Sequence, residues 1–358
     1  MAPPRRQLTA QVLLPVTGES LATLTESQLW TLHELGTGMA SAEVVRSKVQ
    51  TEQTEGPYLD TSLPPALQTN LLQIKNRLGR EALRSCHLCE RHCGIDRLAG
   101  EVAYCGIAAQ SYVGSEFIHM GEEEELVPSY AVFFAGCTFH CVYCQAHRVA
   151  FNPQAGLAPT VPEWVALIGE RQRQGARNVN FVGGTPEPHI ATILEVAAAL
   201  PDEVNIPLIM NANMSMTPMA MQLLDGVIDL YLADFRHGND DCARRLMAID
   251  GYTAFITRNL LHAAAHAELL IRVLVLPNHL DCCLRPILEW IAVHMPQVRL
   301  HVMFQYRPSF KSWEVPDLAR QLDADEKAIA MRWCRELELN NLVIPGDTTR
   351  LRSTEINV

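Results

Sequence analysis

No apolar run in this sequence approaches the roughly 18 residues that a membrane-spanning helix needs. The apolar stretch near the N-terminus covers only residues 12–16, which is too short for a secretory signal, and a transit peptide is the less favoured alternative. A basic excess is also absent, because 29 basic residues stand against 40 acidic ones, giving a net charge of −11. We therefore expect neither a membrane nor nucleic acid among the partners of this chain.

The composition suits a folded protein. Of the 358 residues, 48% are hydrophobic, which supplies a sizeable core and excludes gross disorder. At roughly 150 residues per domain, the length allows one large domain or two ordinary ones.

The cysteines are unevenly distributed. There are eleven, and seven of them lie between Cys86 and Cys144. An odd number without a secretory signal does not suit a disulfide framework, and clustered cysteines in a cytosolic protein more often bind metal or perform redox chemistry. We therefore predict metal or redox chemistry in a reducing, cytoplasmic location.

The N-terminal part differs in pattern from the rest. Residues 1–60 are expected to form a helical extension and linker, with one amphipathic helix over 26–49 and a Gly- and Pro-containing linker over 53–65. A second helix is predicted over 65–83, capped from within residues 60–62. The acidic run 122–125 is expected to be a solvated turn.

From residue 130 onward, short β-branched runs alternate with amphipathic helices. This predicts parallel βα units, and hence a full or partial TIM-like barrel, with an open doubly wound sheet as the competing architecture. In either case functional residues should collect at the carboxyl ends of the strands. The predicted strands are 131–135, 178–182, 208–211, 228–233, 269–276, 300–304 and 342–344, and the predicted helices are 162–174, 190–200, 218–224, 242–247, 254–266, 284–294 and 325–338.

Three cysteines follow the first of these strands, in the segment FFAGCTFHCVYCQ. Cys137, Cys141 and Cys144 are spaced so that all three can reach one metal centre. Three thiolates leave one iron of a cubane cluster without a protein ligand, whereas an electron-transfer cluster normally has four thiolate ligands. The alternatives are a zinc site or three buried thiols.

The C-x3-C-x2-C spacing, with Tyr143 before the last cysteine, resembles the radical S-adenosylmethionine superfamily. The resemblance implies an α/β fold with a partial (β/α)6-type TIM-like barrel. It also implies a catalytic [4Fe–4S] cluster on Cys137, Cys141 and Cys144, whose open iron is chelated by S-adenosylmethionine. Reductive cleavage then gives a 5′-deoxyadenosyl radical that abstracts a hydrogen atom. The adenosine is expected near Tyr143.

Further residues at strand ends match the superfamily. The turn at Gly183 and Gly184 resembles the one that binds the methionyl amino group, although alone it would be an ordinary tight loop. By resemblance, Asp234 and Arg236 contact the methionyl and ribose parts of S-adenosylmethionine. The activating enzymes of this superfamily have Lys at the position of Arg236. The alternative for Asp234 is a helix N-cap. Asn211 and Asn213 are weaker cofactor candidates.

The remaining candidates in the predicted barrel are two possible cofactor contacts and four further cysteines. Arg272, inside a strand that is otherwise apolar, needs an anionic partner, which is either a carboxylate of the cofactor or substrate or a structural acid. His279 is a candidate ribose or carboxylate contact. Cys282 and Cys283 begin a helix, so one of them is a candidate hydrogen-atom relay or substrate contact. The four cysteines Cys242, Cys282, Cys283 and Cys334 lack metal-site spacing with one another. Cys242 and Cys334 are expected to pack as small hydrophobes.

A second cysteine group precedes the barrel. Cys86, Cys89, Cys93 and Cys105 fit a complete four-thiolate site, filled by an auxiliary iron–sulfur cluster or by zinc, with His87 and His92 as substitute ligands. We expect four parts: the extension 1–60, a four-cysteine metal module 61–128, the barrel 129–345 and a tail 346–358.

About 220 residues resemble one branch of the superfamily more closely. These are the PflX-like proteins related to pyruvate formate-lyase activating enzymes, and the similarity lies in CHLCERHCGIDRLAGEVAYCG, FFAGCTFHCVYCQ, FVGGTPEPH, LDGVIDLYLADFRHGNDDCARRL, LVLPNHLDCCLRPILEWIA and QYRPSF. The branch implies hydrogen abstraction from a peptide or protein residue or a small molecule, and a reductant such as flavodoxin or ferredoxin. The alternative is a non-catalytic iron–sulfur or zinc protein that uses the barrel for binding or electron transfer.

Overall fold

The computed structural model describes residues 4–15, 21–49, 68–154, 156–337 and 341–343. The predicted linker 53–65, the predicted caps 60–62 and the predicted tail 346–358 lie outside these residues. Within them, no helix is long and apolar enough to cross a membrane.

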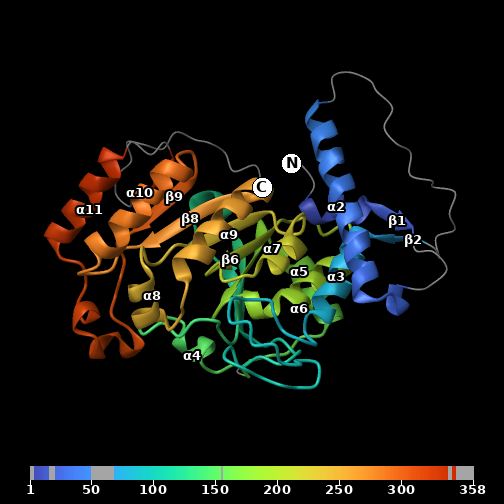
Figure 1. Ribbon diagram of the computed structural model, residues 1–358, viewed down its shortest axis with the longest axis horizontal. Coiled ribbons are helices and arrows are strands. Elements are labelled where there is room, and N and C mark those ends of the chain that lie inside the picture. Colours follow the sequence, from blue (N-terminus) through green and yellow to red (C-terminus); the bar gives the residue numbers. More distant parts are fainter. Residues whose placement is uncertain (1–3, 16–20, 50–67, 155, 338–340, 344–358) are drawn as a thin grey trace.

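The N-terminal elements pack on the outside of the barrel. They are α1 (Arg5–Gln11), β1 (Leu13–Pro15), α2 (Glu26–Val49), β2 (Gln68–Asn70) and α3 (Leu71–Glu81). The predicted helix over 26–49 is confirmed, whereas α3 begins later than predicted because Asn70 caps it by accepting a hydrogen bond from the Gln73 amide. Gly79 brings α3 so close to the barrel that a Cβ there would lie 2.6 Å from Leu194 Cδ1. Figure 1 shows α2 and α3 at the right of the sheet.

Eight strands form the main sheet. β4 (Ser129–Phe134), β5 (Asn178–Gly183), β6 (Leu208–Ala212), β7 (Leu230–Asp234), β8 (Glu268–Leu274), β9 (Arg299–Met303) and β10 (Leu342–Val343) are parallel and lie side by side in chain order. A doubly wound sheet would reverse its strand order, so this alternative is excluded. In the described part β3 (Val113–His119) and β10 form the two edges and do not pair, which agrees with the predicted partial barrel.

β3 was not predicted. It runs antiparallel to β4, and most of its side chains are exposed or half-buried, so it shows no buried apolar face in the sequence. All seven strands predicted from residue 131 onward are confirmed in the described residues, with small shifts at their ends.

Helices follow the parallel strands and cover the outside of the sheet (Figure 1). Half of them begin at recognisable caps, such as the capping box of Thr160 and Glu163 that starts the first long helix. They are α4 (His147–Ala150), α5 (Val161–Arg173), α6 (Ile190–Ala199), α7 (Pro218–Leu224), α8 (Asp240–Met247), α9 (Tyr252–His266), α10 (Arg285–His294) and α11 (Ala324–Glu336).

The inner face of the sheet carries an apolar group and, next to it, a buried polar layer. Leu126, Ile209, Leu230, Leu232 and Leu270 form the apolar group. The loop between β3 and β4 adds Glu122 and Glu123, which both pair with Arg272. The prediction that the acidic run is a solvated turn is therefore wrong, because these two side chains are only 8% and 6% exposed.

Candidate active site

The loop that carries Cys137, Cys141 and Cys144 leaves the carboxyl end of β4. Gly136 has a φ of +84°, and a Cβ on it would lie 2.6 Å from the Cys105 carbonyl oxygen. The amides of His140 and Val142 donate to the carbonyls of Met247 (3.0 Å) and Leu246 (2.9 Å), which hold the loop against the end of α8. Cys137 and Cys141 are buried, and Cys144 is half-buried.

The Gly183–Gly184 turn closes onto this loop. Gly183 has a φ of +116°, and a Cβ on it would lie 2.2 Å from the Phe134 nitrogen. A Cβ on Gly184 would lie 1.9 Å from the Gly136 carbonyl oxygen. The close approach lets the Cys137 thiol donate to the Gly184 carbonyl, at an Sγ–O distance of 3.3 Å. The two glycines are thus required by the fold of the site itself.

Gly183→Ala is expected to lower the free energy of unfolding by about 3 kcal/mol or more, since it combines an unfavourable φ with a backbone clash. Gly175→Ala is the matched control, because Gly175 has a φ of +95° and open space where its Cβ would be. The control should lose only the conformational part, about 1–2 kcal/mol. Urea unfolding monitored by circular dichroism measures both, and equal losses would contradict the close approach.

A buried polar network joins the two glycines to the end of β6. The Glu187 carboxylate accepts from the Thr185 hydroxyl and, at 3.2 Å, from the Ser215 amide. Asn213 donates to Thr138 Oγ1 (2.9 Å) and accepts from the Ser215 amide (3.1 Å). Burial raises the pKa of Glu187 to about 7, against the effect of its hydrogen bonds from backbone amides.

Glu187, Thr138 and Ser215 of this network are not among the residues that the sequence predicted. Their signal was present, because Glu187 lies within GGTPEP and Thr138 within CTFHC, but both motifs were used only for their glycines and cysteines. Asn213 is buried in the network, whereas Asn211 is half-buried on β6. The structure thus gives Asn213 defined partners in the protein.

Asp234 and Arg236 form an ion pair at the end of β7. The Arg236 amide also donates to the Tyr252 hydroxyl oxygen at 2.8 Å. Burial raises the pKa of the Cys141 thiol to about 12, and the neighbouring Arg236 guanidinium acts in the opposite direction. It also opposes the burial that raises the pKa of Cys144. Arg236 therefore places a positive charge next to the cysteine loop.

The cysteine loop fits a thiolate-ligated cluster. Among the described residues, the sulfurs of Cys137, Cys141 and Cys144 are not a group lying within 4.8 Å of one another. Thiolates bound to one zinc ion at about 2.3 Å would be about 3.8 Å apart, so the loop is wider than a single-ion site. The buried Arg236 Nε has no hydrogen-bond partner in the described structure, which leaves a donor for an anionic group beside the loop.

Tyr143 is buried next to these groups. Its hydroxyl lies 2.9 Å from His237 Nε2, and its ring meets the Tyr306 ring edge-on with centroids 6.4 Å apart. Burial raises the pKa of Tyr143 well above its ordinary range. Arg307, one residue further along, is exposed.

Arg272 and His279 have partners inside the protein. Of the two alternatives for Arg272, the structural acid is observed, since Glu122 and Glu123 meet its charge. His279 lies against three sulfur atoms, those of Cys242, Cys282 and Cys283. The prediction that these cysteines lack a metal-site arrangement is wrong, because the fold brings together residues 40 positions apart.

The N-terminal cysteines line a second cavity. The four thiols of Cys86, Cys89, Cys93 and Cys105 surround a small cavity of about 10 Å³. Neither His87 nor His92 is among the lining residues, which also include Arg91, Arg97, Tyr104 and Pro188. Burial raises the pKa of Cys89 and Cys105, and the charge of Arg97 opposes this at Cys105.

This second cavity is attached directly to the carboxyl rim of the barrel. Arg91 Nε donates to the Thr138 carbonyl (2.9 Å) within the cysteine loop. Arg97 Nη2 donates to the Pro188 carbonyl (2.7 Å) behind the glycine turn. The Tyr104 ring stacks on the His140 ring with centroids 4.0 Å apart. The Arg91 guanidinium also lies over the Tyr104 ring, 3.6 Å from its centre. Tyr104 thus lies between the two cysteine groups.

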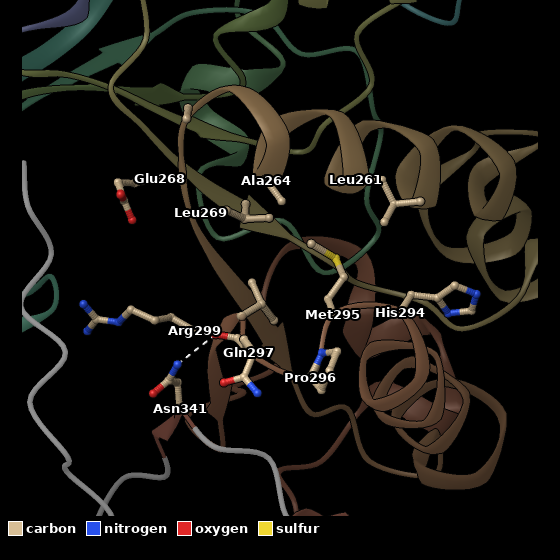
Figure 2. Close-up of a pocket in the computed structure, with 12 residues that line it drawn as sticks. Leu261, Ala264, Glu268, Leu269, His294, Met295, Pro296, Gln297, Arg299 and Asn341 are labelled. Atoms are coloured by element: carbon tan, nitrogen blue, oxygen red, sulfur yellow. Dashed lines mark hydrogen bonds between the residues drawn. The ribbon is translucent and has the colours of Figure 1, made fainter. Parts of the chain in front are cut away.

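A further pocket, of about 590 Å³, lies at the opposite end of the barrel (Figure 2). It is lined by the end of α9 and by the starts of β8 and β9, including Leu269, Met295 and Arg299. None of the cysteines or glycines described above contributes to it. The pocket is therefore separate from the candidate active site.

Comparison with known proteins identifies the class. Residues 131–291 match the Radical SAM superfamily model. An uncharacterized protein of Methanocaldococcus jannaschii is 40% identical over 279 residues, which are 76% of this chain and 81% of that protein. The chain belongs to the radical S-adenosylmethionine superfamily.

Two solved structures are examples of weak structural similarity to this chain. Streptococcus suis SuiB bound to S-adenosylmethionine has 12% identity and a TM-score of 0.45, covering 59% of this chain. The chain spans only 48% of SuiB. The hydrogenase maturase HydG of Carboxydothermus hydrogenoformans has 12% identity and a TM-score of 0.43, covering 90% of this chain and 71% of its own.

Proposed function

We propose that this chain is an enzyme that reductively cleaves S-adenosylmethionine at a [4Fe–4S] cluster held by Cys137, Cys141 and Cys144. The observation that carries the proposal is the contact of the Cys137 thiol with the Gly184 carbonyl, which joins the cysteine loop to the glycine turn. When bound, the cluster supplies the electron that breaks the sulfonium bond to give methionine and a 5′-deoxyadenosyl radical.

The residues around the loop would bind and orient the cofactor. Exposed backbone groups of Gly183 and Gly184 would receive the methionyl amino group, because no Cβ stands in the way. The free Nε donor of Arg236 suits a carboxylate, and Asp234 holds this guanidinium in place. Asn211 and Asn213 would supply polar contacts from β6, and Tyr143 would form a wall on the adenosine side.

Two earlier candidates are left out of this binding site. Arg272 is neutralised by Glu122 and Glu123, so it has no charge left to pair with a cofactor carboxylate. His279 is buried among thiols and only 3% exposed. These positions support the fold of the barrel mouth rather than direct contact with the cofactor.

For the substrate, we propose hydrogen abstraction from a peptide or protein residue or from a small molecule, in keeping with the resemblance to the PflX-like branch. The open sheet edge between β3 and β10 in the described residues supports a larger substrate. The competing function is a non-catalytic iron–sulfur protein. Against it stand the glycine turn and the Asp234–Arg236 pair, which a purely electron-transferring site would not need.

One assay separates these two functions. The protein is reconstituted with iron and sulfide under anaerobic conditions, reduced with dithionite and given S-adenosylmethionine. We expect 5′-deoxyadenosine and methionine in equal amounts, together with a change in the EPR spectrum on adding S-adenosylmethionine. Formation of neither product, with an unchanged spectrum, would refute the proposed function.

We further propose an auxiliary iron–sulfur cluster on Cys86, Cys89, Cys93 and Cys105. No three of these sulfurs are found together within 4.8 Å in the described structure, whereas zinc would hold them at about 3.8 Å. The nearby Arg91 and Arg97 suit an anionic cluster. The position of Tyr104 between the cysteine groups favours a role in delivering electrons.

Cys89→Ala is expected to halve the iron content of the reconstituted protein, from about eight to about four atoms per chain, because only one of two cubane clusters is lost. Cys334→Ala, another buried cysteine, should keep the full amount. Iron and sulfide analysis measures both. Unchanged iron in Cys89→Ala, or zinc at this site in the parent protein, would contradict the auxiliary cluster.

The proposal also covers the electron donor, the cellular location and the division of the chain into parts. A low-potential reductant such as flavodoxin or ferredoxin would supply the electrons. All eleven cysteines are free thiols, including several in contact with one another, which supports a reducing, cytoplasmic location. The division into residues 1–60, 61–128, 129–345 and 346–358 stays a prediction.

A further inference from the structure

We propose that Cys242, Cys282, Cys283 and His279 form a third metal site, a structural zinc site with three thiolate ligands and one imidazole. The four residues come from α8 and from the segment after β8, at the carboxyl rim of the barrel. They share no ligands with either cysteine group described above, so this proposal stands independently of the proposed function.

Five of the six distances among the four ligand atoms lie between 3.2 and 3.8 Å. Cys282 Sγ lies 3.8 Å from Cys242 Sγ and 3.8 Å from Cys283 Sγ. His279 Nδ1 lies 3.6 Å from Cys242 Sγ, 3.2 Å from Cys282 Sγ and 3.8 Å from Cys283 Sγ. All four atoms lie within 4.8 Å of one another.

These separations are those of a tetrahedral zinc site. With Zn–S bonds of about 2.3 Å and a Zn–N bond of about 2.0–2.1 Å, tetrahedral angles place two sulfurs about 3.8 Å apart and sulfur and nitrogen about 3.6 Å apart. Covalently bonded sulfurs would be about 2.05 Å apart, so the cysteines are separate thiols. Three thiolates and one imidazole are a closed ligand set, which is typical of structural rather than catalytic zinc.

Local structure directs these side chains toward one point. Cys282 and Cys283 lie in η5 (Leu280–Leu284), a π-helical turn, which lets adjacent cysteines face the same centre. Cys242 lies in the first turn of α8, where its amide donates to the Asn239 cap at 2.8 Å. Cys242, Cys283 and His279 are buried, and Cys282 is half-buried.

The surroundings also suit bound thiolates. Cys283 Sγ lies 3.3 Å from His237 Nδ1 and 3.9 Å from Asn239 Nδ2, two nitrogen atoms able to donate to a thiolate. With Nδ1 on the metal, His279 Nε2 carries its proton toward Asp317 Oδ2, 4.0 Å away. Arg245 Nη2, which can only donate, lies 3.4 Å from the same nitrogen, so with Nε2 protonated the guanidinium would donate to Asp317 alone, with which it is paired at 3.0 Å.

The site would fix one part of the active-site rim. It ties the β7–α8 connection, which follows Asp234 and Arg236, to the segment after β8. His237 also reaches from Cys283 to the Tyr143 hydroxyl, so the ligand sphere is linked by hydrogen bonds to the catalytic cysteine loop. Holding these loops without taking part in the radical chemistry is the role that a closed zinc site can fill.

The test is the metal content of full-length protein purified anaerobically without reconstitution. Zinc and iron are measured by mass spectrometry in the parent protein, in Cys242→Ala and in Cys334→Ala, a buried cysteine outside the cluster. We expect about one zinc per chain in the parent and in Cys334→Ala, and its loss in Cys242→Ala with iron unchanged. Zinc-edge X-ray absorption of the parent protein should show about three sulfur neighbours and one nitrogen neighbour.

Each other result counts against the site. Zinc absent from the parent, or fully retained in Cys242→Ala, overturns it, as does a zinc shell of four sulfurs, which would place the metal at the N-terminal cysteines. Iron in place of zinc at these ligands overturns the metal assignment. If Cys242→Ala does not fold, the neighbour count in the parent protein decides alone.

Discussion

Cys141→Ala should abolish the release of 5′-deoxyadenosine and remove about four iron atoms per chain, because three thiolates are the minimum that holds a cubane cluster with an open iron. Cys141 is buried beside Arg236, so its replacement leaves the positive charge without the anionic cluster that the site is arranged to hold. We expect no product above background, because the cluster itself is lost. Iron analysis and chromatographic product detection on the same sample measure both consequences.

Cys334→Ala is the matched control for this variant. Cys334 is also buried, but it packs in α11 within the apolar core. It should keep both iron and activity. If Cys141→Ala lost product formation but kept all of its iron, the cysteine would be acting in the chemistry without binding the cluster, and the assignment of the loop would be wrong.

Arg272→Met should lower the free energy of unfolding by about 3–5 kcal/mol, because it leaves Glu122 and Glu123 buried without their positive partner. Arg272 is 12% exposed, so solvent offers little compensation. Arg173→Met is the control, since Arg173 pairs with Glu170 on the surface at 68% and 48% exposure and such pairs contribute at most about 1 kcal/mol. Chemical unfolding at pH 7 measures the two variants side by side.

The difference in free energy of unfolding between the parent protein and Arg272→Met should also depend on pH. Burial acts to raise the pKa of Glu123, but hydrogen bonds from His301 and Arg272 and the charge of Arg272 outweigh it, so the pKa lies well below its ordinary range. The resulting stabilisation is present above the unfolded-state pKa of about 4.3 and is lost as the pH falls through the folded-state value. The gap between parent and Arg272→Met should therefore shrink on acidification. A gap independent of pH would mean that Arg272 stabilises the barrel through packing alone.

Alternating strands and helices were predictable from the sequence because the apolar periodicities are local. The runs that became β5 and β6 match almost residue for residue. β3 was missed for a physical reason, since an edge strand with one partner and exposed side chains needs no apolar pattern. The acidic run was misjudged because the partner of Glu123 lies 149 positions away in the chain.

The cysteines show the same limit more sharply. Cys137, Cys141 and Cys144 lie within one loop, so their spacing alone carries the prediction. Cys242 lies 40 positions before Cys282, and only the adjacency of β7 and β8 brings the two sulfurs together. Spacing rules detect ligands that share a loop, whereas ligands that meet through the sheet become visible only once the strand order is known.

The loop that places Glu122 and Glu123 on the inner face of the sheet bears on how ligands can reach the cysteine loop. With Leu126 it contributes to the buried apolar and charged layers on the inner face of the sheet. In the proposed enzyme, cofactor and substrate would reach the cysteine loop from the carboxyl ends of the strands. A molecule seated deep, against the glycine turn, must then enter before one seated above it and leave after it. We therefore expect an order of binding and release that does not depend on which substrate is used.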